Sequence, residues 1–469
     1  MNSGAGERRA VDNVSPRCEP RGENNKIIVL KILEGAVAMS AEQDVVGVAK
    51  ARPSIGAKGI FAVVLGNGYE FFDFGVYAVY IGVIGQTFYP GDNTLASDLA
   101  AAATFGVGFI ARPLGGMLIG AYGDRAGRKA AMTLTIGLMA LGSAMIAVLP
   151  GYSTIGVAAP ILLVLARLVQ GFAVGGEMGP STMFMLEAAP PGRRMFYASW
   201  QLASQNLGSL AYGLIGFLLA AALSKQNLYD WGWRAPFALG ILIAPIGIYI
   251  RNQLEETLAR EPNVVPAHAG AVVSIVLKDY WFSVLLGVAL IAGGTITQYF
   301  LINMTPYAIR TLHLPDAAAM LGSISVGLTG AAGALIGGLL ADRFGIKTIA
   351  VIPRIILLIA LLPVMWWLVA SPSATTLVLA IAVLSVLQGA SSGVGIMLIP
   401  LIFPKTVRAT GLAFTYSLGV AIFGGTATYI VTWLVGVTGN PLASVYYVFI
   451  ANIAMLAAVL AIREHSYDA

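Results

Sequence analysis

The sequence predicts an all-α integral membrane protein with twelve transmembrane helices arranged as two six-helix halves. Hydrophobic residues make up 57% of the chain and charged residues 11%, whereas a soluble domain carries about 25% charged residues. The mean hydropathy is +0.80, and the apolar residues fall in blocks of about 20 or more, long enough to span a bilayer. Because lipid offers the backbone no hydrogen bonds, such blocks must be helices.

A loop that occurs twice divides the chain into these halves. The first copy, Gly120–Lys129, reads GAYGDRAGRK, and the second, Gly338–Lys347, reads GLLADRFGIK. They share the pattern Gly-x-x-x-Asp-Arg-x-Gly-x-(Arg/Lys), and each follows the second apolar segment of its half. Internal repetition of this kind is typical of secondary transporters.

The expected domains and helices follow from these blocks. A polar tail of mixed charge over residues 1–55 is typical of disorder. A polar connection, 251–279, joins the first half, 56–250, to the second half, 280–462, and a short end follows at 463–469. The expected helices are residues 59–84, 97–121, 130–149, 158–187, 195–223, 234–250, 281–304, 318–340, 347–369, 375–402, 409–435 and 443–462.

Lysine and arginine predict the orientation, because cytoplasmic loops carry an excess of both. Basic residues cluster in the loops on one side, including both copies of the repeated loop, whereas the other side has little beyond Lys225 and Arg310. We therefore expect both termini in the cytoplasm and a multi-pass chain in the inner membrane. The apolar run near Ile27 is too short for a signal peptide and is interrupted by Lys31. Met39 is an alternative start.

Two carboxylates, Glu70 and Asp73, lie near the middle of the first expected helix. Their spacing of three residues puts both on one face of that helix. A charge at this depth costs at least about 2.5–3.5 kcal/mol on insertion scales, so each carboxylate needs a partner or a proton. A carboxylate balanced between burial and a nearby arginine can take up and release protons during a transport cycle. A fixed salt bridge is the structural alternative.

Two arginines, Arg112 and Arg167, also lie inside expected helices. Arginine stays charged, and its forked donors suit carboxylates. The pair could bind an anionic substrate or neutralise Glu70 and Asp73, and snorkelling or bonding between helices is the alternative. Arg354 lies only one to two turns inside its helix, so we expect it to snorkel to the cytoplasmic face.

Polar side chains on two further helices suit hydrogen bonding to a solute in a central cavity, with bonding between helices as the alternative. The candidates are Gln201, Gln205, Asn206, Gln298, Tyr299 and Asn303. Gln388 and Tyr416 are weaker candidates of the same kind. Gly171, Gly175 and Gly179 recur at every fourth position of one helix, which is typical of close helix packing.

Charged residues in the cytoplasmic loops are candidates for a gate. The basic residues of the repeated loop would hold the cytoplasmic end closed, and Asp124 could meet the N-terminus of a neighbouring helix. Such contacts form in one conformation and break in the other, although basic loops also serve topology alone. The gate candidates are Gly120, Asp124, Arg125, Gly127, Arg128, Lys129, Glu187, Arg193, Arg194, Asp342 and Arg343.

The sequence carries no catalytic, metal or cofactor motif, so it predicts neither an enzyme nor a bound cofactor. The three histidines fall in expected loops or tails, and the one cysteine, Cys18, lies in the polar tail. Ser391 sits in a Gly-x-Ser-x-Gly pattern, but inside an expected helix and without the preceding strand of the hydrolase motif. No phosphate-binding loop for ATP is present. The net charge of +5 does not indicate nucleic acid, because the basic residues lie beside membrane segments.

The chain resembles the major facilitator superfamily over nearly its whole length beyond the tail, because Gly120–Lys129 and its copy match the signature of that superfamily. More narrowly, it is similar to the metabolite:proton symporter family, which includes symporters for citrate, 2-oxoglutarate, shikimate, and proline or betaine. The resemblance implies alternating access by rocking of the two halves, driven by inward proton flow. The matching segments begin at Gly66, Arg112, Arg167, Glu187, Trp231 and Leu254, and the stretch from Gly106 to Glu187 looks most like the citrate members.

The chain departs from the family pattern at two positions. Ile346 stands in the second loop copy where the first has Arg128, so we expect a weaker cytoplasmic clamp in the second half. Leu401 stands where the family usually places a glutamate before the Phe403-Pro404 pair, so the charge network of the second half is expected to be incomplete.

Together these features predict a monomeric, proton-coupled importer of a small organic acid. Citrate-like tri- or dicarboxylates are the first candidates for its substrate. Glu70 or Asp73 would take up the proton, and Arg112 and Arg167 would bind substrate carboxylates. A zwitterion such as proline or betaine is the alternative, with the aromatic cluster Tyr69–Phe74 around its ammonium group. A non-transporting membrane sensor is a third interpretation, although neither terminal segment resembles a signalling domain.

Overall fold

The computed structural model describes residues 57–126, 128–175, 185, 189–252, 276–404 and 407–462. Every regular element in these ranges is a helix, which confirms the predicted fold class. The tail expected at 1–55, most of the connection expected at 251–279 and the end expected at 463–469 lie outside the described residues.

The first half contains a helix at each of its six expected positions. The predicted helix 59–84 is in fact two helices with a bend of 62° between them, at Tyr80. Gly179 and the other residues after Gly175 in the predicted helix 158–187 lie outside the described ranges, except for Met185. The elements are α2 (Ala57–Val79), α3 (Ile81–Phe88), α4 (Thr94–Ala126), α5 (Arg128–Val148), α6 (Tyr152–Ile155), α7 (Ala158–Gly175), α9 (Arg194–Ala222), α10 (Lys225–Asp230), η1 (Gly232–Arg234) and α11 (Ala235–Asn252).

The second half likewise has helices at its six expected positions. The predicted helix 409–435 is interrupted by a π-helical turn, a feature that often occurs at functional sites. The elements are α13 (Trp281–Ile302), α14 (Met304–Arg310), α15 (Asp316–Phe344), α16 (Ile346–Ala370), α17 (Ala374–Gly395), η2 (Ile396–Leu398), η3 (Pro400–Ile402), α18 (Arg408–Gly419), the π-helix η4 (Val420–Gly424), α19 (Gly425–Thr438) and α20 (Ala443–Ala461).

Nine stretches of the described residues are long and apolar enough to cross a membrane, and the bent pair α2 and α3 makes a tenth. The apolar part of α5, Thr133–Val148, is shorter than a full span because Arg128 and Lys129 begin the helix. Within the described residues, each of the twelve expected segments thus contains a helix, while ten at most meet the length and hydropathy of a bilayer span.

Local sequence signals account for several helix ends. Ser373 begins α17 with a capping box, in which its side chain and that of Thr376 each accept from the other's backbone N–H. Pro315 precedes α15, and Asp316 places a negative charge in its first turn. Gly345 lies between α15 and α16 with φ of 90°, a conformation that favours glycine. This requirement explains the second glycine in the second copy of the repeated loop.

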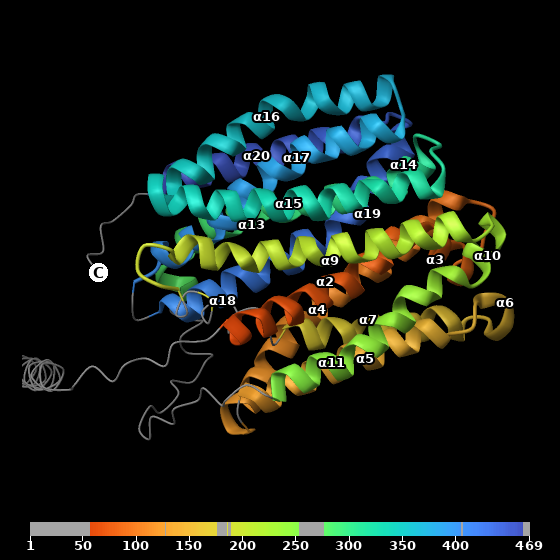
Figure 1. Ribbon diagram of the computed structural model, residues 1–469, viewed down its shortest axis with the longest axis horizontal. Helices are drawn as coiled ribbons and strands as arrows, with labels where there is room; N and C mark the ends of the chain where they lie inside the picture. The colour runs from red at the N-terminus through yellow and green to blue at the C-terminus, as the bar shows by residue number, and fades with distance from the viewer. Residues whose placement is uncertain are drawn as a thin grey trace, which may run out of the picture. The chain divides into compact units, whose positions relative to one another are not determined.

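The two halves meet along a seam between α9 and α15, which lie side by side in Figure 1. Around this seam α2 packs on α9 and α17 packs on α15, and on another side of the interface α4 contacts α19. One end of the bundle, called here the basic end, holds Arg193, Arg194, Arg343 and Lys347. The helices α3, α6, α10 and α14 lie at the other end (Figure 1), called here the opposite end.

At the basic end the seam is held by Asp342 of the repeated loop. Its two carboxylate oxygens accept hydrogen bonds from the backbone N–H groups of Met195 at 2.8 Å and Phe196 at 3.0 Å, in the first turn of α9. The first N–H groups of a helix have no partner within the helix, and its N-terminus favours negative charge. The second copy of the loop, which belongs to the second half, therefore caps a helix of the first half.

Replacing Asp342 with Ala should lower the free energy of unfolding by roughly 1 kcal/mol, as the loss of a helix cap does. The reason is that two first-turn N–H groups of α9 lose their acceptor. Thermal unfolding of the purified protein in detergent measures the effect. Arg343→Gln is the matched control, because the Arg343 side chain is exposed and lies over the ring of its neighbour Phe344. Equal melting temperatures for the two variants would contradict the capping role.

Candidate functional site

A cavity of about 630 Å³ lies between the two halves, where α4 and α9 of the first face α13, α17 and α18 of the second. The cavity is partly open and extends from the middle of the bundle toward the basic end. On α4 its lining begins at Arg112, and on α13 it stops at Tyr299. Most of the lining is apolar. The polar side chains in it are Arg112, Gln201, Gln205, Thr295, Gln298, Tyr299, Gln388, Ser392, Tyr416 and Ser417.

Arg112 is the one charged side chain among the described residues that line this cavity. It is held there because α4 and α7 pack closely, with Gly175 against the backbone of Arg112 and Gly171 against that of Gly108. These contacts support the packing role predicted for Gly171 and Gly175. The guanidinium lies 4.0 Å from the ring centroid of Phe109, a cation–π distance.

Arg167, the second arginine expected to contact substrate, does not line the cavity. It is fully buried on α7, and its guanidinium lies over the rings of Phe74 at 4.3 Å and Tyr77 at 4.5 Å. Its Nη1 donates to Oε1 of Gln170 at 2.6 Å. The aromatic rings separate Arg167 from the space that Arg112 faces, so the two arginines are placed in different environments.

Asp73 is fully buried inside the first half. Its carboxylate accepts hydrogen bonds from Oγ of Ser143 on α5 and from Nε2 of Gln170 on α7. Because Oε1 of the same glutamine accepts from Arg167, the amide of Gln170 links the carboxylate to the guanidinium. The two charges are thus joined through a neutral group rather than paired directly.

Glu70 occupies another environment, although it lies on the same face of α2 by spacing. It is buried and lies near Tyr299 and Tyr416, which belong to the second half. The described partners of Asp73 therefore belong to its own half, whereas Glu70 lies near side chains of the other half.

The predicted polar residues divide between the cavity and the contacts around it. Gln201, Gln205, Gln298 and Tyr299 line the cavity. Asn206 lies behind it and accepts from Nε2 of Gln298 at 3.3 Å. Asn303 is buried beyond the lining. Gln298 thus lines the cavity and also bonds between helices, so a position in the lining and bonding between helices do not exclude each other.

Gln201 also bonds between helices. Its Nε2 donates to Oδ1 of Asn67 on α2 at 3.2 Å, and Asn67 donates to the backbone oxygen of Gln201 at 2.8 Å. This reciprocal contact fixes α9 against α2 while the same glutamine faces the cavity.

The expectation that Arg354 snorkels is wrong, because Arg354 is fully buried between α16, α17 and α20. The polar groups of Gln388, Ser391 and Asn452 surround it and remove the need to reach the surface. Gln388 and Tyr416, the weaker candidates, line the cavity. Ser392 also lines it and was missed, although two successive serines in an apolar helix were a usable signal.

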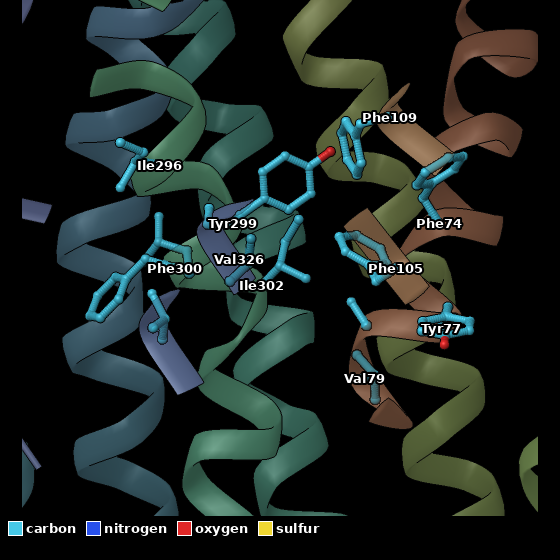
Figure 2. Packing of buried hydrophobic residues seen from close by; sticks show 14 of the residues in the cluster. Phe74, Tyr77, Val79, Phe105, Phe109, Ile296, Tyr299, Phe300, Ile302 and Val326 are labelled. Carbon is cyan, nitrogen blue, oxygen red and sulfur yellow. The ribbon is translucent and has the colours of Figure 1, made fainter. Parts of the chain in front are cut away.

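Aromatic side chains close the bundle beyond the cavity, on the side of the opposite end. The ring of Tyr299 lies 5.4 Å from that of Phe109 and 5.8 Å from that of Phe105, with edge-to-face geometry. Figure 2 shows Tyr299 of the second half reaching toward Phe109, with Phe74 and Tyr77 farther to the right. This aromatic group ends the cavity at mid-bundle.

An ion pair joins the halves at the opposite end. Nη2 of Arg310 on α14 lies 2.8 Å from Oδ1 of Asp98 on α4 and donates to the backbone oxygen of Gly82 at 3.1 Å. Both side chains are mostly buried. The opposite end is therefore closed by a charged contact beyond the aromatic group.

The gate candidates are described only in part. Asp342 caps α9 as described above, and Arg193, Arg194 and Arg343 are exposed. Only the backbone is described for Gly120, Asp124, Arg125, Arg128 and Lys129, and Gly127 and Glu187 lie outside the described residues entirely. Among the side chains that are described, no group of three or more His, Cys, Asp or Glu could hold a metal ion.

Comparisons with known proteins all point to the same family of membrane transporters. The model of the Major Facilitator Superfamily matches residues 63–424. A citrate-proton symporter of Salmonella typhi is 35% identical over 415 residues, which cover 87% of this chain and 95% of that protein. The alpha-ketoglutarate permease of Escherichia coli (strain K12) is 36% identical over 442 residues, covering 90% and 98%.

Relatives with another kind of solute in their names match as well. The glycine betaine/proline/ectoine/pipecolic acid transporter OusA of Dickeya dadantii (strain 3937) is 34% identical over 422 residues, covering 87% of this chain and 83% of that protein. Among solved structures, a D-xylose-proton symporter superimposes with a TM-score of 0.68 at 20% identity, covering 86% and 96%. That likeness concerns the fold alone.

The shape of the cavity predicts access from the basic end only. In a Cys18→Ser background, which removes the one native cysteine, Ala413→Cys places a thiol in the lining. A membrane-impermeant maleimide should label this thiol from the side of the basic end and not from the side of the opposite end. The measurement compares the labelling of inside-out vesicles with that of right-side-out vesicles. Ser224→Cys, exposed beside α10, is the control that should label from the other side.

Adding Asp98→Asn to the Ala413→Cys protein should raise labelling from the opposite side about fivefold, because a partly buried ion pair contributes about 1 kcal/mol to closure. Equal labelling of Ala413→Cys from both sides before that change would show that the opposite end is not closed.

Proposed function

The chain belongs to the major facilitator superfamily, and we propose that it is a proton-coupled symporter that imports a small organic acid, with citrate-like tri- or dicarboxylates first. The observation that carries this proposal is the position of Arg112, a guanidinium in a cavity between two helical halves, in the same half as two buried carboxylates on α2. The family consists of transporters rather than enzymes, so the cavity is a place for a solute to bind and move.

The charges inside the bundle favour an anionic solute. With the Asp98–Arg310 ion pair set aside, three buried guanidiniums, those of Arg112, Arg167 and Arg354, stand against the two buried carboxylates of Glu70 and Asp73 among the described residues of the spanning helices. Arginine keeps its charge under all ordinary conditions. The interior therefore has an excess of one positive charge when both acids are ionised and of three when both are protonated. An acid with two or three carboxylates balances that excess.

The same arrangement suggests how protons and solute are coupled. A proton taken from the outside by Glu70 or Asp73 would weaken the hold of the carboxylates on the arginines, so that Arg112 binds a substrate carboxylate directly and Arg167 acts through its charge. The halves then rock about the α9–α15 seam, and loss of the proton inside releases the solute. Gln201, Gln205, Gln298 and Tyr299 would contact the bound solute, with Asn206 and Asn303 behind them.

A zwitterion such as betaine or proline is the second candidate. Phe71, Phe414 and Tyr416 line the cavity beside Tyr299, and aromatic faces attract quaternary ammonium groups. The ring of Phe74, which was expected to take part, already packs against both Arg112 and Arg167. The named relatives include transporters of both solute classes.

The remaining assignments concern the membrane. We place the chain in the inner membrane as a monomer, with the basic end and both termini in the cytoplasm, because the basic residues lie on one side. The two six-helix halves, 56–250 and 280–462, would act as the moving bodies. The repeated loop and the Arg193 and Arg194 pair would form the cytoplasmic gate together with Glu187 and Asp342.

Replacing Glu70 with Gln and Asp73 with Asn together should abolish the stimulation of citrate uptake by an inward proton gradient, since neither amide can carry the coupling proton. Labelled citrate uptake into proteoliposomes, with and without the gradient, measures this. Citrate exchange without a gradient is the control, and it should persist because Arg112 remains. Gradient-driven uptake that survives in the double variant would falsify the coupling role.

Replacing Arg112 with Gln should raise the KM for citrate at least about tenfold, because a hydrogen bond to a charged group contributes about 1.5–3 kcal/mol. Arg112→Lys is the matched control and should retain part of the affinity through its charge. Competition by a panel of unlabelled acids and betaine separates the two candidate functions. Displacement of a bound probe by betaine or proline, with no uptake of citrate, would replace the first candidate with the second.

A further inference from the structure

Arg354 carries a buried charge that no described carboxylate neutralises. It is fully buried, and all of its described hydrogen-bond partners are neutral. Nη1 donates to Oε1 of Gln388 at 2.7 Å and to Oδ1 of Asn452 at 2.6 Å, Nε donates to Oγ of Ser391 at 3.1 Å, and Nη2 donates to Oγ of Ser392 at 2.6 Å. An ionisable group kept inside a membrane bundle at such cost indicates a functional role.

Two of these partners, Gln388 and Ser392, also line the cavity. Nε2 of Gln388 donates to the backbone oxygen of Gly294 at 2.7 Å, and its Oε1 accepts from Arg354. Ser391 does not line the cavity, and its hydroxyl donates to the backbone oxygen of Ala350 at 2.7 Å. Ser392 differs from both, since no acceptor among the described residues takes its proton. Its O–H group is therefore available to the cavity.

The space in front of this hydroxyl is kept open by a glycine. A methyl group added to Gly294 on α13 would lie 3.2 Å from Oγ of Ser392. Behind the hydroxyl, the guanidinium of Arg354 donates to the same oxygen and polarises its O–H bond, which makes it a stronger donor to an anion.

We propose that Ser392, with Arg354 behind it, forms a second carboxylate subsite on the wall of the cavity that belongs to the second half, while Arg112 provides the first on the wall of the other half. The inference rests on the proposed function and deepens it. An acid with at least two carboxylates then bridges the halves, and one with a single carboxylate does not. Ser392 is a specificity-determining residue, and Arg354 acts through it as a positioning residue.

The test compares two neighbouring serines that both bond Arg354. Inhibition constants are measured in proteoliposomes for citrate, succinate and acetate against labelled citrate, in wild type, Ser392→Ala and Ser391→Ala. Ser392→Ala should weaken citrate and succinate about tenfold, the effect of losing one charge-assisted hydrogen bond, and leave acetate within twofold. Ser391→Ala should behave as wild type, because its hydroxyl does not face the cavity. Equal losses in both variants, or a loss for acetate as large as for succinate, would overturn the subsite.

Gly294→Ala supplies an independent readout that removes none of the hydrogen-bonding groups around Arg354. The added methyl should reduce affinity for succinate and citrate more than for acetate, and unchanged affinities would count against the subsite.

Failure of the subsite proposal can be told apart from failure of the proposed function. If wild type transports citrate while Ser392→Ala keeps its preference for di- and tricarboxylates, only the subsite is wrong. If wild type binds no organic acid, the proposed function itself is wrong.

Discussion

The cost of placing charge inside an apolar bundle is the constraint on which the rest of the structure depends. Four of the buried charges are stabilised by three kinds of contact. Arg112 and Arg167 lie against aromatic rings, Asp73 is bonded through a glutamine and a serine, and Arg354 is enclosed by neutral amides and hydroxyls. Because these devices come from different helices, they also fix how the helices are rotated about their axes. The polar interior thereby determines which side chains reach the cavity.

The contacts between the halves are distributed unevenly, and their distribution determines how the halves could move. The α9–α15 seam is continuous and is capped by Asp342 at the basic end. The opposite end is closed by aromatic packing and by Arg310 with Asp98. The cavity occupies the part of the interface near the basic end that such contacts leave unfilled. A rocking motion about the seam would exchange the closed and open ends without breaking the seam itself.

Much of the fold was predictable from the sequence, and much of the site was not. Apolar blocks predict where helices lie because the bilayer sets their length, and the repeated loop predicts two halves. The break at Tyr80 and the π-turn at Val420–Gly424 have no such signal. Spacing places Glu70 and Asp73 on one face, but neighbouring helices decide which partner each one meets. Arg354 was misjudged for the same reason, since its distance from the helix end says nothing about the groups on α17 and α20 that enclose it.

The hydrogen-bond donors and acceptors of the Gln170 amide link the protonation of Asp73 to the hydrogen bond of Arg167. With Asp73 ionised, the NH₂ group of Gln170 faces the carboxylate, and its oxygen is left for Arg167. A protonated Asp73 carries a hydrogen that needs an acceptor. On Oδ1 the hydrogen can bond Oγ of Ser143, whose hydroxyl then donates to the backbone oxygen of Met139. On Oδ2, which faces Gln170, it requires a half-turn of the amide, which would present the oxygen to it. The NH₂ group would then face the guanidinium, two donors would oppose each other, and Arg167 would lose its one described hydrogen bond. A single uncharged side chain can in this way convert the arrival of a proton into the release of an arginine, with no movement of the backbone.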